Sequence, residues 1–131
     1  MKLLKLLLAS LTVTVALSAN ETLTKNMIEM ETALNTIQKG FLYNSPDMVK
    51  AGIKQIETTN DIFNNQKATA KYLPKNKKHM ANIAFNASKR MDSAANEMKA
   101  YLNNKEYSKA FASYSEILNS CNACHSVVRG W

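Results

Sequence analysis

Apolar residues recur every three or four positions along most of the chain, the spacing of helices that bury one face. The pattern is interrupted by residues typical of helix ends and starts, at Gly40, Ser45-Pro46-Asp47, Pro74, Asn103-Asn104 and Gly130. These signals predict four helices, at about residues 21–40, 46–65, 75–102 and 105–129. Short connections make consecutive helices antiparallel. The expected fold is therefore all-α, an up-down-up-down four-helix bundle.

The last predicted helix has the most regular apolar series, formed by Tyr107, Phe111, Tyr114, Leu118, Cys121, His125 and Val128. This series predicts that a cysteine and a histidine share a buried stripe with core aromatics. The third predicted helix turns small or flexible side chains toward its neighbours, chiefly Ala84, Ala87, Met91, Ala94 and Met98. Alanine fills less space than leucine at native packing density. Either the helices approach closely there, or something else fills the space.

Composition bounds the size and class of the protein. The chain has 131 residues, 46% of them hydrophobic and 21% charged, which suits one globular domain. Three glycines and two prolines are too few for the many turns of a β-sandwich or barrel.

The first nineteen residues resemble a targeting segment rather than part of the fold. Lys2 and Lys5 precede an apolar run at 6–17, and the small residues Ser18 and Ala19 follow. We expect residues 1–19 to be a secretory signal peptide, residues 20–131 to be the mature domain, and the protein to be periplasmic. The run is short of the roughly 20 residues of a bilayer span. No stable membrane insertion is expected after cleavage, although an uncleaved anchor is the alternative.

The mature domain remains basic. Loss of residues 1–19, which hold two lysines and no acid, lowers the formal net charge from +7 to +5. Five lysines gather around Pro74, namely Lys67, Lys71, Lys75, Lys77 and Lys78. Such a cluster either steers an acidic redox partner or an anionic membrane surface, or is a solvated connection between helices. Nucleic acid is not expected as a partner, because the chain has no recognition motif.

One motif carries chemistry, the run Cys121-Asn122-Ala123-Cys124-His125. Residues at i, i+3 and i+4 share a helix face. Two thiols at this spacing form thioethers with the vinyl groups of one haem, while the adjacent imidazole reaches its iron. Export supports this interpretation, because haem c is attached outside the bacterial cytoplasm. We therefore expect one haem c, attached through Cys121 and Cys124, with His125 on the iron.

Three other interpretations of the two cysteines are weaker. A thioredoxin-like pair needs its cysteines at the start of a helix that follows a strand. A zinc site needs four ligands in tetrahedral geometry, and His79 is the only other histidine available beside Cys121, Cys124 and His125. A disulfide within one helix is disfavoured by geometry.

The C-terminal position of the motif resembles the cytochrome c′ family, the class II c-type cytochromes. Shared features are the segment from Cys121 to Arg129 on the fourth helix and the Lys39-Gly40 step that closes the first. The family often has an aromatic residue where this chain has Val128, and this chain is somewhat short for it.

The resemblance implies a haem held in one end of the bundle, with His125 as its proximal ligand. It places Arg129 near the haem edge or the propionates, whereas a simpler role is a cation at the helix C-terminus. Trp131 is expected to cover the haem edge or to pack on the end of the bundle.

Only six residues follow His125, and none of them can ligate iron, so a sixth ligand must come from upstream. Family members either leave this position open and bind small gases, or fill it with a methionine from the first helix and carry electrons. We expect Met27 to be the ligand, with Met30, His79, Met80 and an open position as alternatives.

No catalytic constellation accompanies the expected iron site, so we do not expect an enzyme. The leading hypothesis is a periplasmic monohaem cytochrome that carries single electrons between redox proteins. The alternative is a five-coordinate protein that binds gases such as NO or CO. A homodimer is a further possibility, although the sequence assigns no interface to it.

Overall fold

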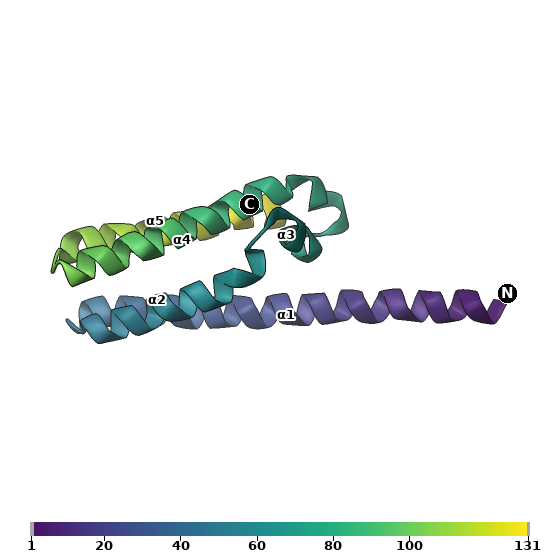
Figure 1. The fold of residues 1–131 in the computed structure, drawn as a ribbon, viewed down its shortest axis with the longest axis horizontal. Coiled ribbons are helices and arrows are strands. Elements are labelled where there is room, and N and C mark those ends of the chain that lie inside the picture. The colour runs from purple at the N-terminus through teal and green to yellow at the C-terminus, as the bar shows by residue number, and fades with distance from the viewer. Residues whose placement is uncertain (1, 131) are drawn as a thin grey trace.

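A computed structural model describes the backbone of residues 2–130 and the side chains of residues 20–130. Every regular element within this range is helical, and their order is α1 Lys2–Leu42, α2 Pro46–Asn60, the 3-10 turn η1 Asp61–Phe63, α3 Gln66–Tyr72, the 3-10 segment η2 Lys75–Met80, α4 Ala81–Asn103 and α5 Tyr107–Arg129 (Figure 1). The all-α prediction is confirmed. The side chains of the predicted signal peptide, residues 1–19, lie outside the described residues, as does Trp131.

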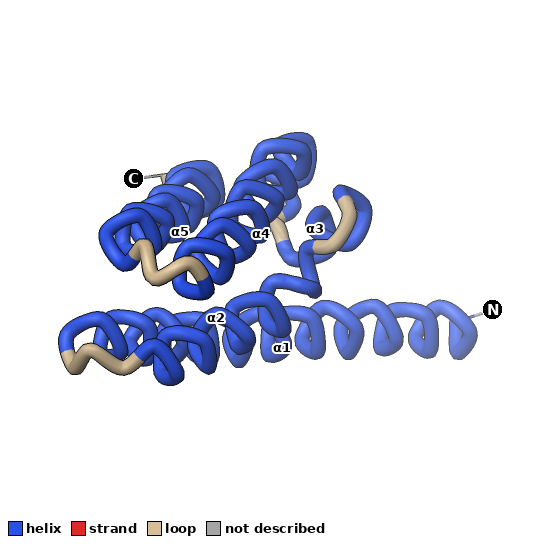
Figure 2. Tube along the Cα trace, turned by 60° about the vertical axis from the view of Figure 1, so that its left-hand side comes forward, coloured by secondary structure: helices blue, strands red, loops and turns tan. Residues whose placement is uncertain are grey.

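The long helices form two antiparallel pairs that lie in two layers (Figures 1 and 2). One layer is α1 with α2, and the other is α4 with α5. Contacts between α2 and α4 join the layers. The α1–α2 and α4–α5 connections lie at the same end of the molecule, and α3 lies toward the other end (Figure 1). Among the residues that the structure describes, no helix combines the length and hydropathy needed to span a bilayer.

Two glycines allow α1 and α2 to approach closely. A Cβ atom at Gly52 would lie 2.6 Å from Cγ1 of Ile37 and 2.8 Å from the carbonyl oxygen of Ala33. A Cβ atom at Gly40 would lie 2.6 Å from Cγ2 of Val49. The absence of a side chain at both positions is therefore required by the packing of this pair.

Aromatic side chains set the register between α1 and α5. The rings of Phe41 and Phe111 meet edge to face, with centroids 5.3 Å apart. One turn further along α5, the hydroxyl of Tyr114 donates a hydrogen bond of 3.4 Å to the carbonyl of Leu34. Both contacts join an early residue of α5 to a late residue of α1, as antiparallel helices require.

Buried amides fix the C-terminal end of α2. Nδ2 of Asn26 donates to the carbonyl of Thr59 at 2.6 Å. Nδ2 of Asn60 donates to the carbonyl of Ser88 at 3.0 Å and to Oδ1 of Asp92 at 2.6 Å. These bonds cross from α2 to α1 and to α4, so they hold three helices together where the regular part of α2 ends.

The connection between α2 and α4 differs from its prediction. The expected helix at 46–65 ends at Asn60 and tightens into η1, and α3 was not predicted. The side chain of Asn65 caps α3 by accepting from the backbone N–H of Ala68 at 2.8 Å. Pro74 holds the preceding Leu73 in an extended conformation, which stops α3. The helix expected from residue 75 starts as 3-10 turns and becomes α-helical at Ala81.

The first helix also ends later than predicted. Gly40 does not terminate α1, which continues to Leu42, and Asn44 takes the left-handed conformation with φ of 51°. Gly40 serves close packing instead. Gly130, in contrast, closes α5 with φ of 74°, as its position predicts.

The buried stripe of α5 lies beside the predicted one. Its buried residues are Ala110, Ser113, Tyr114, Ile117 and Ser120. Tyr107, Phe111 and Leu118, which were expected in the core, are between 42% and 50% exposed. The buried stripe combines the large residues Tyr114 and Ile117 with alanine and serine, whose small side chains permit α5 to pack closely on α4.

Candidate functional site

The cysteine–histidine motif lies in the last three turns of α5. Cys121, Cys124 and His125 are all partly buried, and both cysteines carry free thiols. The helix places the three side chains on one side because they are three and four residues apart. All three line the same cavity.

The cavity has a volume of about 620 Å³, within the roughly 300–1,000 Å³ range of cofactor and ligand sites. Its wall draws on every helix of the fold. α1 contributes Met27, Met30 and Leu34, α4 contributes Ala84, Ala87 and Met91, and the connecting segment contributes Phe63, Tyr72 and Leu73. Of the small and flexible residues that the sequence predicts on the inner face of α4, Ala84, Ala87 and Met91 thus line the cavity, whereas Ala94 and Met98 are buried in the main core.

Two apolar clusters meet at the motif. Cys121 packs against the main core, which includes Met30, Met91 and Ile117. Cys124 and Val128 pack against a second cluster that Leu73, Ala81 and Ala84 form. The motif therefore bridges the core of the bundle and the apolar cover that the α3–α4 region supplies.

Four buried polar side chains interrupt the apolar wall, Asn60, Thr69, Ser88 and Ser120. Asn60, Thr69 and Ser120 have hydrogen-bond partners. Oγ of Ser88 has none among the described residues, although this side chain is only 6% exposed. A buried hydroxyl without a partner costs about 1–3 kcal/mol. The Ser88 hydroxyl is thus a hydrogen-bonding group available to a cavity occupant.

Burial also sets the protonation of the motif. It lowers the pKa of His125, and the charge of Arg129 lowers it further, so the imidazole is neutral and suited to bind a metal. Burial raises the pKa of Cys121 to about 11, with a smaller contribution from Cys124, whose own pKa burial also raises. Both sulfurs are therefore thiols at neutral pH, the form whose S–H adds across a vinyl group.

The structure separates the candidates for a sixth ligand. Met27 and Met30 both line the cavity. Met30 is 6% exposed and belongs to the main core, whereas Met27 packs beside that core. His79 and Met80 lie in η2 and are not part of the cavity wall, and His79 is exposed. Arg129 is exposed but reaches the cavity at the end of α5.

The sequence did not predict the buried polar side chains of the cavity wall, nor the helix α3 beside the cavity. Asn60 was visible only as an interruption of an apolar series, and Ser88 as one serine in an alanine-rich helix. Neither pattern indicates which polar atom lacks a partner, because that depends on contacts between helices. Asn65, nine residues before the helix stop at Pro74, was the available signal for α3.

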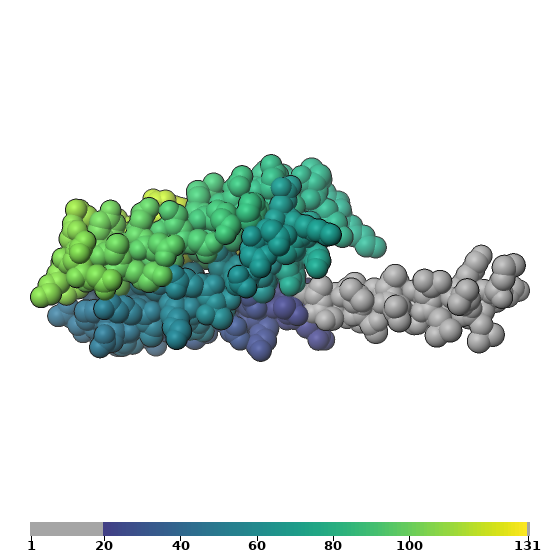
Figure 3. All heavy atoms as spheres, viewed as in Figure 1, coloured from purple at the N-terminus to yellow at the C-terminus, as the bar shows by residue number. Residues whose placement is uncertain are grey.

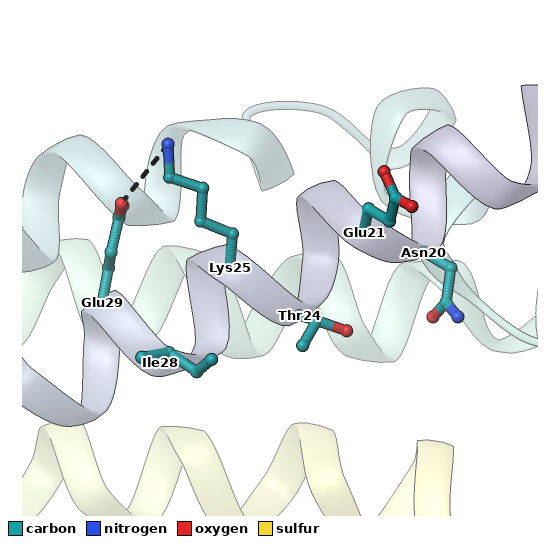
Figure 4. Close-up of a pocket in the computed structure, with 6 residues that line it drawn as sticks. All are labelled: Asn20, Glu21, Thr24, Lys25, Ile28 and Glu29. Atoms are coloured by element: carbon teal, nitrogen blue, oxygen red, sulfur yellow. Dashed lines mark ion pairs between the residues drawn. The ribbon is translucent and has the colours of Figure 1, made fainter.

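A second hollow lies on α1 alone, lined by Asn20, Glu21, Thr24, Lys25, Ile28 and Glu29. Figure 4 shows Lys25 and Glu29 paired on one side of the helix, while Asn20 and Thr24 point to the other. The Lys25–Glu29 ion pair spans 3.8 Å. None of the predicted site residues lies there, so this hollow is a groove on a solvated helix surface.

Comparisons with known proteins find no match: no family model fits the sequence, and no curated protein or solved structure is similar to it. Within the described part of the chain, no group of three or more His, Cys, Asp and Glu side chains is arranged to hold a metal ion by itself.

Proposed function

We propose that this protein is a periplasmic monohaem c-type cytochrome of the cytochrome c′ type that carries single electrons. In this proposal α1, α2, α4 and α5 are the four helices of an up-down-up-down bundle, and α3 belongs to the connection. The observation that carries the proposal is the joint presence of Cys121, Cys124 and His125 in one largely apolar cavity. No catalytic constellation accompanies them, so an enzyme is not proposed.

The chemistry of the donor set fits a covalently held haem. Two thiols at i and i+3 suit two vinyl groups, and the neutral imidazole that follows suits the iron. The apolar wall suits the ring, while the Ser88 hydroxyl and Arg129 suit the carboxylates at its edge. The haem supplies a one-electron change of its iron between the ferric and ferrous states.

The remaining roles belong to the chain. His125 holds the iron from α5, and the apolar side chains Leu34, Phe63 and Leu73 exclude water from the ring. Exclusion of water and a neutral ligand pair both favour the ferrous state, because they leave the extra charge of the ferric state poorly solvated.

Helix register supports Met27 as the sixth ligand. Phe41 on α1 contacts Phe111 on α5, and the two helices are antiparallel. Fourteen residues before Phe41 on α1 is Met27, and fourteen residues after Phe111 on α5 is His125. Fourteen residues are about four turns, so both side chains arrive at the same height. A thioether is a neutral ligand that raises the reduction potential.

The partners in this proposal are redox proteins of the periplasm. The described surface also offers a place for a second copy of the chain, because Tyr107, Phe111 and Leu118 are large, exposed and on one side of α5.

The test is the visible spectrum of the protein exported from a host that attaches haem c. We expect one covalent haem, a split ferrous band and a methionine-to-iron charge-transfer band. Met27→Ala should remove the charge-transfer band, and Met30→Ala should keep it. A high-spin spectrum that responds to CO and ignores Met27→Ala would establish the five-coordinate gas-binding alternative instead.

Covalent attachment has its own control. Cys121→Ser combined with Cys124→Ser should leave no haem on the chain after denaturing electrophoresis. Haem that survives in this double variant would contradict attachment through the motif.

A further inference from the structure

Positive charge is concentrated in one stretch of the chain. Residues 62–91 hold six lysines, one arginine and no acidic residue. The rest of residues 20–131 hold eight basic and ten acidic residues, so their net charge is negative. The mature domain is therefore strongly asymmetric in charge, although its total charge is modest.

Five of these cations form what we call the basic face, Lys67, Lys71, Lys75, Lys77 and Lys78 in α3 and η2. All but Lys77 are exposed, and Lys77 is partly exposed. Among the described residues the ion pairs are Lys25–Glu29, Lys89–Asp92, Lys99–Glu57 and Lys109–Glu106. None of them involves the basic face, so no ion pair within the described residues neutralises its charge.

The basic face is the outer side of the segment that covers the cavity. Thr69, Tyr72 and Leu73 line the cavity, and Lys71 and Lys75 lie within two residues of them. In Figures 1 and 3 this teal segment lies on the surface near the end of the molecule where α5 finishes. Only the segment of α3 and Leu73 thus lies between the basic face and the candidate haem site.

We propose that an acidic protein docks on the basic face and exchanges single electrons with the haem behind it. This inference rests on the proposed function. Charge complementarity aligns the partner, because the negative remainder of the domain repels an acidic surface while the basic face attracts it. The contact then forms where the path to the ring is shortest.

The surface favours a protein over a membrane as the occupant. Interfacial membrane binding needs apolar side chains that enter the lipid beside the cations. Of the large hydrophobic side chains exposed in the described residues, only Ile83 falls within 62–91, and it is 39% exposed. The basic face therefore offers charge without an apolar anchor.

The first test is binding, with poly-L-glutamate as the probe for an acidic polypeptide. The full exported protein is compared with Lys67→Glu/Lys75→Glu and with the control Lys39→Glu/Lys50→Glu, which changes the net charge equally at the other end of the molecule. Both replacements on the basic face lie in the first turns of their helices, where an acid is tolerated well. We expect binding about tenfold weaker for the first variant than for the control.

The dependence of binding on ionic strength is a second test of the same contact. Raising the ionic strength from about 10 mM to about 150 mM shortens the Debye length from about 30 Å to about 8 Å. Binding by the unchanged protein should weaken over this range by about tenfold or more, and binding by the basic-face variant should change much less.

Electron transfer is measured separately with hexacyanoferrate(III), an anionic oxidant. One electron leaves the ferrous iron of the protein, which becomes ferric, and reduces the reagent to hexacyanoferrate(II), with no proton transferred. The rate should fall about tenfold in the basic-face variant and stay near the original value in the control. The cationic oxidant hexaammineruthenium(III) should show the opposite trend.

Three outcomes overturn the inference, and they are distinguishable. Equal loss of binding in both variants would show a general charge effect without a docking face. Stronger binding to vesicles of phosphatidylglycerol and phosphatidylcholine than to poly-L-glutamate, lost in the basic-face variant, would identify a membrane instead of a protein. Protein exported without haem would defeat the proposed function itself, whatever the binding result.

Discussion

Ser88 is the residue of the cavity wall whose hydrogen bonding would respond most directly to an occupant. Its backbone carbonyl accepts from Asn60, so the main chain there is satisfied. Its side-chain hydroxyl is buried without a partner among the described residues. A polar atom in that state destabilises the empty protein and gains a partner when a polar group enters. If the proposed haem fills the cavity, the hydroxyl would therefore link the stability of the protein to occupancy of the site.

Ser88→Ala should change stability in a way that depends on the haem. In protein made without haem attachment, removal of the unpartnered hydroxyl should raise the free energy of unfolding by about 1 kcal/mol. In the haem-loaded protein the gain should vanish or reverse, because the hydroxyl then has a partner. Urea unfolding of both forms measures this difference.

Ser113→Ala is the matched control on α5. The hydroxyl of Ser113 donates to the carbonyl of Lys109 at 3.3 Å, and Ser113, like Ser88, is a buried residue. Its loss should lower the free energy of unfolding by about 0.5–1.5 kcal/mol in both forms. Identical behaviour of the two serine variants would show that Ser88 has no link to the cavity.

At the scale of elements, two helix pairs depend on different packing devices. The α1–α2 pair uses Gly40 and Gly52 to bring backbones together, whereas α5 presents alanine and serine to α4. In both pairs, small side chains allow the two helix backbones to lie close together. The pairs can therefore be stable while the space between them, near the motif, stays open.

Gly52→Ala tests the close packing of α1 and α2. Alanine favours a helix over glycine by about 1 kcal/mol, so an exposed position would gain stability. Here the new methyl group would lie 2.6 Å from Ile37 and 2.8 Å from the Ala33 carbonyl. We expect a net loss of about 1–3 kcal/mol in the free energy of unfolding. Thermal or urea unfolding measures it, and exposed Lys50→Ala on α2 should stay within about 0.5 kcal/mol.

The sequence predicted the helical class, the C-terminal cap at Gly130 and the apolar stripe of α4 because these depend on local spacing. It misassigned part of the stripe of α5, since Tyr107, Phe111 and Leu118 were placed in the core and are exposed, whereas Tyr114 is buried as predicted. Which residues of α5 are buried depends on how closely α4 packs against α5, and the local spacing of residues does not predict that distance. The same limit explains why α3 and the roles of Asn60 and Ser88 were not predicted.

On the scale of the whole molecule, the cavity divides the interior into a packed part and an open part. Toward the α4–α5 connection the core is closed around Ile53, Ile56 and Met98, which are fully buried. Toward the end of α5 the wall holds Ala84 and Ala87 beside the motif. A cavity of about 620 Å³ leaves apolar side chains of a small domain without packing partners on one side. The proposed haem would then be part of the core as well as the functional group.

The same substitution at two sites of α4 tests this division. Ala87 lines the cavity, whereas Ala95, two turns further along, is fully buried in the closed core. In haem-free protein, Ala87→Leu should raise the free energy of unfolding by about 0.5–2 kcal/mol because it fills space. Ala95→Leu should lower it by about 1–3 kcal/mol because it overpacks. Urea unfolding measures both changes.

Haem attachment should suffer from the substitution that stabilises the haem-free protein and not from the one that destabilises it. Ala87→Leu should reduce the fraction of exported chains that carry covalent haem, because the leucine occupies space that the ring needs, and Ala95→Leu should leave that fraction nearly unchanged among folded chains. The ratio of haem absorbance to protein measures it. A stabilised Ala87→Leu protein that still takes up haem fully would show that the ring lies elsewhere. Equal loss of unfolding free energy in both leucine variants would show that the helices pack together around Ala87 in solution and leave no cavity there.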